Sequence, residues 1–283
     1  MQQVQTPDKL REVLAKFRQT EETIGFVPTM GNLHEGHLAL MRYAKEAADK
    51  VVASIFVNPL QFDRPDDLEA YPRTLDEDAR QLDKLGVDLL FVPYVDDIYP
   101  GDMSMVTRVE VPGISERLEG TSRAGHFTGV ATVVAKLFNL IQPDIAVFGE
   151  KDYQQLAVIR KMVEELNVPT EILSIPTVRE PSGLAMSSRN NYLSEEQRSQ
   201  AAGLSRVLNQ LAHSIRSGER AFRELEANGI EMLLKDGFKP DYLEICHSET
   251  LSPANKNDAS LVVLAAAWLG PARLIDNVYL PHI

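Results

Sequence analysis

The stretch FVPTMGNLHEGHLAL, residues 26–40, links an apolar run to a helical pattern through a turn that holds two glycines and two histidines. The residues Thr23–Thr29 are largely apolar, which is typical of a strand buried on both faces of a parallel sheet. A helix that begins near Gly36 presents unpaired N–H groups and a partial positive charge at this turn. Gly31 and Gly36 permit a close backbone approach. The stretch therefore predicts a strand–turn–helix unit that suits an anion.

The first half of the chain repeats this alternation of strands and helices. Further strands are predicted at Val51–Asn58, Val87–Pro93, Asp144–Gly149 and Glu171–Val178. One helix is predicted with Thr6 as N-cap and Pro7 at its first position. A second is predicted over residues 74–86, with a Thr74–Glu77 capping box and a stop at Gly86. Two more are predicted over residues 130–141 and 153–167. Short connections between alternating elements predict an α/β fold with a Rossmann-like, doubly wound parallel sheet.

The pattern changes after about residue 180. A long helix is predicted from a capping box at Ser194 and Gln197 to a stop at Gly218, followed by a second helix over residues 221–235. Three strands without intervening helices then cover residues 241–247, 261–270 and 272–278. We expect two domains, a nucleotide-binding domain at 1–178 and a smaller α+β lid domain at 179–283. The segment 175–190 contains proline and glycine turn signals, so we expect a hinge there.

Composition narrows the classes of function. The 283 residues carry a formal net charge of −12, and no run of Lys and Arg is long enough to favour nucleic acid. The single cysteine excludes an internal disulfide and suits a reducing compartment. The first ten residues lack the order of a signal peptide, and the longest apolar run is too short to cross a bilayer. We expect a cytoplasmic protein without a membrane or nucleic-acid partner.

Three interpretations compete for the turn. A zinc site would use His34, Glu35 and His37, but zincin histidines stand four residues apart and no third ligand is obvious. A phosphate loop would need Lys and Ser or Thr after the second glycine, where His37 and Leu38 stand instead. The histidines could also simply cap the helix. Two glycines and two histidines at one strand end favour a nucleotide site with imidazole donors.

The motif His34-Glu35-Gly36-His37 resembles the H-x-G-H signature of the nucleotidyltransferase superfamily, and Ala185–Asn190 resembles a shortened form of its second, mobile loop. More narrowly, the chain resembles the pantoate–β-alanine ligase family, also called pantothenate synthetases. The matching pieces are VPTMGNLHEGH, SIFVNPLQFDRPDDLEAYPRTLDED, LEGTSRAGHFTGVATVVAKLFNLIQPDIAVFGEKDYQQL, GLAMSSRNNYLS and, more loosely, AAAWLGPARLIDN. This resemblance implies a homodimer that joins pantoate to β-alanine through a pantoyl adenylate, with ATP as substrate and AMP and pyrophosphate as products.

The resemblance also implies roles for single residues. It implies an ATP site formed by Met30, Gly31, Asn32, Leu33, His34, Glu35, Gly36, His37, Gly149, Glu150, Lys151, Asp152, Val178, Met186, Ser187, Ser188 and Arg189. It implies His37 as proton donor, with His34 and Lys151 as further catalytic residues. Gln61 and Gln155 would bind pantoate, and Gln61 also β-alanine. No protein metal ligand is expected, because the ATP phosphates would carry most of the coordination of Mg²⁺.

Position along the chain adds to some of these roles. Lys151 stands where a strand ends, the edge at which doubly wound sheets bind ligands, although a solvated surface lysine is the ordinary alternative. Asp152 could cap the next helix or contact the ligand. On sequence alone, Gln155 is expected to be an exposed residue of a first helical turn. Met186 stands where leucine is common in the family, and Ala124 where proline is common.

Some residues and functions stay open. Arg123 could clamp a phosphate or a carboxylate or belong to a surface loop, and the role of His126 is open. The acidic cluster Asp76–Asp78 favours the N-terminus of a helix over a metal site. The alternatives to a ligase are another H-x-G-H adenylyltransferase with a different small acceptor, a metal-dependent hydrolase and a nucleotide sensor without catalysis.

Overall fold

The computed structural model describes all 283 residues, which form two compact units. Unit 1 comprises Met1–Glu150 and Gln155–Pro176, and unit 2 comprises Lys151–Gln154 and Thr177–Ile283. The short insertion Lys151–Gln154 groups with the C-terminal part although it follows a strand of unit 1. The boundary at 178/179 remains a prediction about the folding domains.

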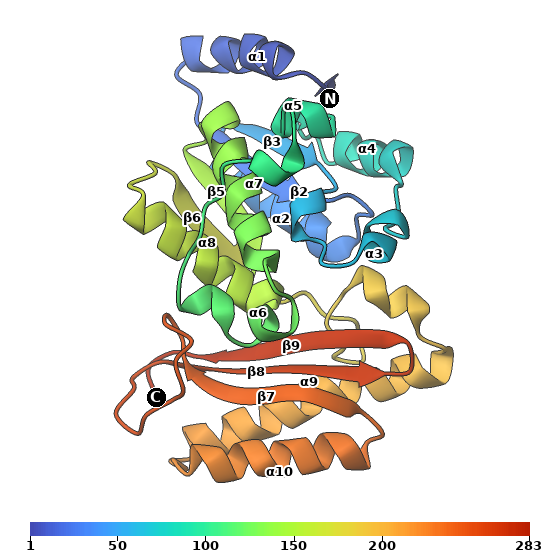
Figure 1. Cartoon of the computed structure of the whole chain (residues 1–283), viewed down its shortest axis with the longest axis vertical. Helices are drawn as coiled ribbons and strands as arrows, with labels where there is room; N and C mark the ends of the chain where they lie inside the picture. The colour runs from blue at the N-terminus through green and yellow to red at the C-terminus, as the bar shows by residue number, and fades with distance from the viewer. The chain divides into compact units, whose positions relative to one another are not determined.

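Unit 1 is built on a six-stranded parallel sheet (Figure 1). Its strands are β1 (Gln2–Val4), β2 (Ile24–Thr29), β3 (Lys50–Ile55), β4 (Leu89–Phe91), β5 (Ile145–Gly149) and β6 (Glu171–Ile175). Their order in the sheet is β1-β4-β3-β2-β5-β6, and every adjacent pair is parallel. The predicted sheet is thus confirmed. The edge strand β1 was not predicted, because three residues with two exposed side chains give no periodic signal.

Helices cover both faces of this sheet. On one face, α2 (Glu35–Ala47) and α4 (Leu75–Lys84) pack Met41 and Leu82 into a buried cluster with Val27 of β2. On the other face, Phe26 meets Phe138 of α7 (His126–Ile141) edge to face at 6.2 Å, and α1 (Pro7–Gln19) packs against α7. Phe26 and Val27 point to opposite faces because side chains alternate along a strand. Both faces are therefore buried, as the apolar strand pattern predicted.

The helix ends follow the sequence signals with one exception. Thr6 caps α1, accepting the Lys9 N–H at 3.4 Å, and Pro7 takes the first position as predicted. The predicted capping box at the start of α4 is wrong, because Thr74 makes no cap hydrogen bond there. Its hydroxyl instead donates to the Asp78 carboxylate at 3.0 Å.

Unit 2 is the predicted α+β arrangement. An antiparallel sheet of β7 (Lys239–His247), β8 (Leu261–Leu269) and β9 (Ala272–Leu280) has β8 in its centre. Helices α9 (Glu195–Arg216) and α10 (Phe222–Lys235) pack beside one another and share one buried cluster with the sheet. The predicted capping box at the start of α9 is confirmed, with Ser194 and Gln197 each accepting a backbone N–H from the other.

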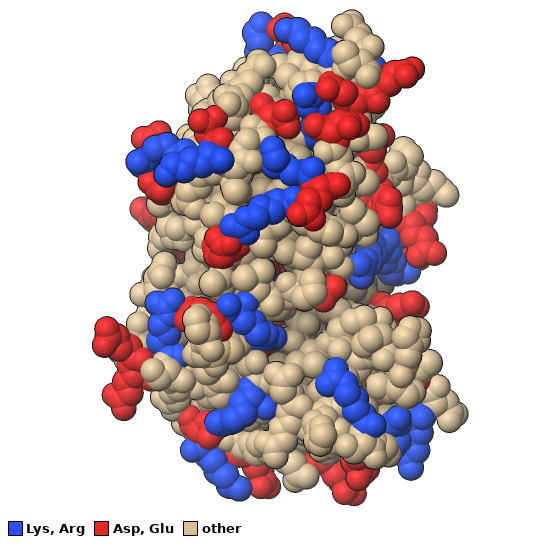
Figure 2. All heavy atoms as spheres, turned by 180° about the vertical axis from the view of Figure 1, so that it is seen from behind, with Lys and Arg blue, Asp and Glu red and all other residues tan.

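The remaining elements are short connections and one helix after β5. They are η1 (Pro59–Gln61), α3 (Pro65–Glu69), α5 (Val95–Ile98), η2 (Met103–Met105), η3 (Ile114–Glu116), α6 (Glu119–Ser122), η4 (Glu150–Asp152), α8 (Tyr153–Glu165) and η5 (Ser188–Tyr192). No helix is long and apolar enough to cross a membrane. On the face seen in Figure 2, acidic and basic side chains are interspersed.

Candidate functional site

The order of the strands predicts where unit 1 would bind a ligand. From β2 the chain moves to β3 on one side of the sheet, whereas β5 lies on the other side of β2. Parallel sheets bind ligands outside the carboxyl ends of their strands at such a reversal of direction. The turn at Gly31 follows β2, and β5 ends at Gly149, so the predicted glycine turn and the end of the second strand both lie at this switch point.

The turn after β2 holds its two histidines by reciprocal caps. His34 is the N-cap of α2, and its Nδ1 accepts the Gly36 N–H at 3.1 Å. In return His37 Nδ1 accepts the His34 N–H at 3.3 Å, and the two ring centroids lie 4.1 Å apart. A backbone N–H can only donate, so each neutral imidazole carries its hydrogen on Nε2. Capping and a donor role for Nε2 are therefore compatible in the same two residues.

This geometry disfavours a zinc site. Both Nδ1 atoms accept backbone hydrogens, and Glu35 forms an ion pair with Arg42 on the same helix. No group of three or more His, Cys, Asp or Glu side chains is arranged to hold a metal ion.

A buried carboxylate supports the same turn from α4. Asp78 is 1% exposed, and its two oxygens accept the N–H groups of Asn32 and Leu33, each at 2.8 Å. Asn32 has a positive φ of 53°, and Gly31 has a φ of 81°. A Cβ at Gly31 would lie 3.1 Å from Asp78 Oδ2, so glycine allows both the backbone conformation and the close approach. Asp78 was expected only to favour the helix N-terminus, and its contact with the turn was not predicted.

The turn after β3 carries Gln61. This side chain is 8% exposed, and its amide oxygen accepts a hydrogen bond from Asn58 Nδ2 at 3.0 Å. Its backbone carbonyl accepts from His126 Nδ1 at 2.8 Å, and Arg123 lies 3.3 Å from Nε2 of that histidine. A carbonyl only accepts, so His126 holds a hydrogen on Nδ1. His126 thus supports the Gln61 turn, a role that sequence reasoning left open.

The turn after β5 is held from β6. Glu150 Oε1 accepts the Ser174 hydroxyl at 3.0 Å, and Ser174 in turn accepts from Arg160 at 3.0 Å. Gln155 is half-buried near the start of α8, so the expectation that it is exposed is wrong. Its neighbour Gln154 is 3% exposed.

Unit 2 carries the rest of the predicted ATP residues. Lys151 Nζ lies 3.6 Å from Asp152 Oδ2, and its side chain is 19% exposed, which is less than an ordinary surface lysine. The Lys151 carbonyl accepts from Asn277 Nδ2 of β9 at 3.0 Å. Strand β9 therefore fixes the backbone next to this lysine.

Within the predicted hinge segment 175–190, the residues 178–186 form a hairpin that hydrogen bonds and ion pairs hold in place. Val178 accepts the Met186 N–H at 2.9 Å, and Arg179 forms a two-bond ion pair with the buried Asp276 of β9 at 2.7 and 2.9 Å. Glu180 accepts hydrogen bonds from Arg198 at 2.8 and 3.0 Å and from Asn190 at 3.0 Å. The Arg198 hydrogen bonds lower the pKa of Glu180, while burial acts in the opposite direction. Asp276 thus holds the start of the loop through Arg179, and Glu180 holds its end through Asn190.

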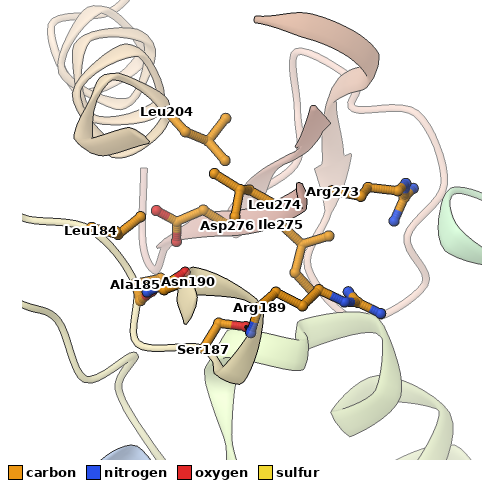
Figure 3. Close-up of a pocket in the computed structure, with 10 residues that line it drawn as sticks. All are labelled: Leu184, Ala185, Ser187, Arg189, Asn190, Leu204, Arg273, Leu274, Ile275 and Asp276. Atoms are coloured by element: carbon orange, nitrogen blue, oxygen red, sulfur yellow. Dashed lines mark hydrogen bonds between the residues drawn. The ribbon is translucent and has the colours of Figure 1, made fainter. Parts of the chain in front are cut away.

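The tip of this loop borders a pocket within unit 2 (Figure 3). Ser187 caps η5 by accepting the Arg189 N–H at 3.3 Å. Figure 3 shows Ser187 and Arg189 on one side of the pocket and residues of β9, including Asp276, on the other. The Arg189 side chain extends along the pocket rather than toward the Asp276 carboxylate. Two of the predicted ATP-binding side chains therefore border one cavity.

Comparison with known proteins identifies relatives over the whole chain. A family model described as Pantoate-beta-alanine ligase matches residues 2–279. A pantothenate synthetase from Pseudomonas putida (strain KT2440) is 58% identical over 280 residues, which cover 99% of this chain and 98% of that protein. The crystal structure of pantothenate synthetase from Thermus thermophilus superposes with a TM-score of 0.90 at 48% identity, covering 98% of this chain and 99% of that one. The ligase from Francisella tularensis, described as a complex with β,γ-ATP and β-alanine, gives a TM-score of 0.80 at 35% identity, covering 99% and 97%.

Proposed function

Because this chain belongs to the pantoate–β-alanine ligase family, we propose that it condenses (R)-pantoate with β-alanine in a reaction driven by ATP. In the first step a pantoate carboxylate oxygen attacks the α-phosphorus of ATP, and the bond to pyrophosphate breaks. In the second step the amine of β-alanine attacks the acyl carbon of pantoyl adenylate. The C–N bond of pantothenate forms, AMP leaves with the C–O bond electrons, and the amine loses its proton.

Neither step requires a nucleophile from the protein. The protein has to orient three substrates and neutralise charge that develops on the phosphates, which fixed hydrogen-bond donors can do. The observation that carries the proposal is the turn after β2, where Asp78 holds the Asn32–Leu33 backbone and reciprocal caps hold His34 and His37 at the switch point of the sheet. This rigid turn presents the N-terminal end of α2 to an anion.

We assign the site residues as follows. The proposed ATP-binding residues are Met30–His37, Gly149, Glu150, Lys151, Asp152, Val178 and Met186–Arg189. His37 and His34 donate from Nε2 to the phosphates, and Lys151 supplies a positive charge. Gln61 and Gln155 bind pantoate, and Gln61 also contacts β-alanine. The support is the family resemblance together with the placement of the unit 1 residues after β2, β3 and β5.

The assembly and the metal are part of the same proposal. Mg²⁺ would be held mainly by the ATP phosphates and would neutralise part of their charge, with few ligands from the protein. We also propose a homodimer, as the family resemblance implies, and a cytoplasmic location, which suits a chain whose single cysteine, Cys246, is buried and forms no disulfide.

Pantoate-dependent exchange of labelled pyrophosphate into ATP, measured without β-alanine, tests the proposal. Exchange should require pantoate and stop on chelation of Mg²⁺, because adenylate formation is reversible and precedes the amine. The alternative acceptors of H-x-G-H adenylyltransferases are phosphopantetheine and nicotinamide mononucleotide, and they serve as the matched comparison. Exchange supported by one of them and not by pantoate would contradict the proposal. This alternative is not favoured, because the relatives above match over almost their full length.

A further inference from the structure

A chain of buried polar side chains lies beneath Gln61 in unit 1. Tyr99 is fully buried, Asn58 is 1% exposed and Gln61 is 8% exposed. The Tyr99 hydroxyl donates to Asn58 Oδ1 at 2.8 Å, and Asn58 Nδ2 donates to Gln61 Oε1 at 3.0 Å. Tyr99 directly follows α5 and stands 41 residues from Asn58 in the sequence. No step of the reaction described above uses this tyrosine.

The backbone fixes the orientation of the Asn58 amide. Its Nδ2 lies 3.1 Å from the Gly129 carbonyl, which can only accept a hydrogen bond. Its Oδ1 lies 3.3 Å from the Leu60 backbone N–H, which can only donate. A flipped amide would set its oxygen against the Gly129 carbonyl and its NH₂ group against the Leu60 N–H, so both backbone groups would lose their partner. Only one orientation of Asn58 therefore satisfies both backbone groups.

The orientation of Gln61 follows from that of Asn58. The second hydrogen of Asn58 Nδ2 points at Gln61, so the Gln61 atom facing it has to be the amide oxygen. The Gln61 NH₂ group is then turned away from Asn58. A flipped Gln61 would set one NH₂ against another in a dry environment, where an unsatisfied polar group is costly.

Tyr99 supplies the partner that completes this network. Its hydroxyl occupies the remaining acceptor position of Asn58 Oδ1, whose other hydrogen bond, from Leu60, is long. Burial raises the pKa of Tyr99, so the hydroxyl keeps its hydrogen throughout the physiological range. Its ring packs against Phe56, with centroids 6.1 Å apart, so the hydroxyl has little freedom to move.

We propose that Tyr99 is a positioning residue that acts through Asn58 to present Gln61 to pantoate as a hydrogen-bond donor. The inference rests on the proposed function, because it takes Gln61 as a pantoate-binding residue. It deepens that function in one respect. The pantoate atom that meets the Gln61 NH₂ group is an acceptor, either a carboxylate oxygen or the lone pair of a hydroxyl.

The test is the steady-state kinetics of Tyr99→Phe, which removes the hydroxyl and keeps the ring contact. Loss of one buried hydrogen bond should raise the KM for pantoate about fivefold to tenfold. The KM for ATP should change less than twofold, which distinguishes positioning of Gln61 from a general loss of structure. Tyr94→Phe is the matched control, because Tyr94 is 62% exposed and should behave as the wild type.

A double-mutant cycle with Gln61→Ala shows whether the effect passes through Gln61. If it does, adding Tyr99→Phe to Gln61→Ala should change the KM for pantoate less than twofold. Equal losses in both backgrounds, or an unchanged KM in Tyr99→Phe, would overturn the inference.

Two further results keep the inference separate from the proposed function. An inactive wild-type protein would refute the proposed ligase activity itself, whereas an active wild type with an unchanged KM for pantoate in Gln61→Ala would refute the role of Gln61.

If Tyr99→Phe does not fold, Asn58→Asp replaces it as the test, because the second oxygen of the new carboxylate repels Gln61 Oε1 and the Gly129 carbonyl. That variant should raise the KM for pantoate by more than about tenfold, and a smaller change would refute the network.

Discussion

The carboxylate of Asp78 offers the sharpest perturbation of the nucleotide turn. In Asp78→Asn the side chain keeps its shape, but one acceptor oxygen becomes an NH₂ group. If that group replaces Oδ2, the Thr74 hydroxyl can rotate to accept from it, whereas the Asn32 N–H loses its partner. If it replaces Oδ1, the buried Leu33 N–H loses its partner. At least one hydrogen bond from backbone to a charged group is therefore lost in either orientation.

The size of the effect follows from this count. A hydrogen bond to a charged group contributes about 1.5–3 kcal/mol. If all of this free energy stabilises the turn, the ratio of the ordered turn to its alternatives falls by roughly 10- to 150-fold. Only the protein with an ordered turn binds ATP, so the apparent dissociation constant rises as the fraction of protein in that state falls. We therefore expect the KM for ATP to rise by about an order of magnitude. The midpoint of thermal unfolding should fall by roughly 3–8 °C.

Pyrophosphate exchange at varied ATP concentration and thermal unfolding by circular dichroism measure both effects. Asp76→Asn is the matched control, because Asp76 stands on the same first turn of α4 and is exposed. The reasoning would be refuted if Asp78→Asn and Asp76→Asn had the same KM for ATP and the same unfolding midpoint.

Three further changes test separate parts of the account. His37→Ala should slow single-turnover adenylate formation about 10²–10³-fold. His37→Gln can replace the cap but not the imidazole, so it should be equally slow. Adenylate formation at the wild-type rate in either variant would remove His37 from the mechanism. Gly129→Ala should lower stability by about 1–3 kcal/mol or more, because its Cβ would lie 2.3 Å from the Leu60 carbonyl oxygen, and an unchanged unfolding midpoint would contradict that packing. The pKa of Glu180 lies below its ordinary value of 4.5, so the ionised carboxylate stabilises the fold at pH values above 4.5. This stabilisation is lost as the pH falls through the pKa of Glu180 in the folded protein. The unfolding midpoint of Glu180→Gln should thus lie below that of the wild type at neutral pH and converge with it in acid, and a gap that does not vary with pH would argue against the Arg198 pair.

Much of the fold could be predicted because the buried strands and capped helices leave local signals. The strands β2, β3 and β5 are apolar in consecutive residues, and Ser194 with Gln197 forms the box that its spacing indicates. The Thr74–Glu77 box does not form, and the Thr74 hydroxyl is turned toward the Asp78 carboxylate, to which it donates. Local spacing cannot reveal that contact, since Asp78 is buried by its hydrogen bonds to a turn 45 residues earlier in the chain.

The same distinction holds for the site. The H-x-G-H turn is compact in sequence, so its chemistry was visible before its structure. Four supporting residues lie far along the chain from the groups that they hold, namely Asp78, Tyr99, Gly129 and Asp276. In the sequence alone, each of them is indistinguishable from an ordinary core or helix residue. Buried polar contacts of this kind are set by the tertiary fold and not by periodicity.

The central claim is that the carboxylate of pantoate attacks ATP before any amine takes part. Mass spectrometry of the protein incubated with ATP, Mg²⁺ and pantoate, with β-alanine withheld, tests it most directly. The account predicts accumulation of pantoyl adenylate together with pyrophosphate, and its conversion to pantothenate and AMP when β-alanine is added. Formation of pantothenate with no detectable adenylate, or release of ADP and phosphate in place of AMP and pyrophosphate, would contradict it.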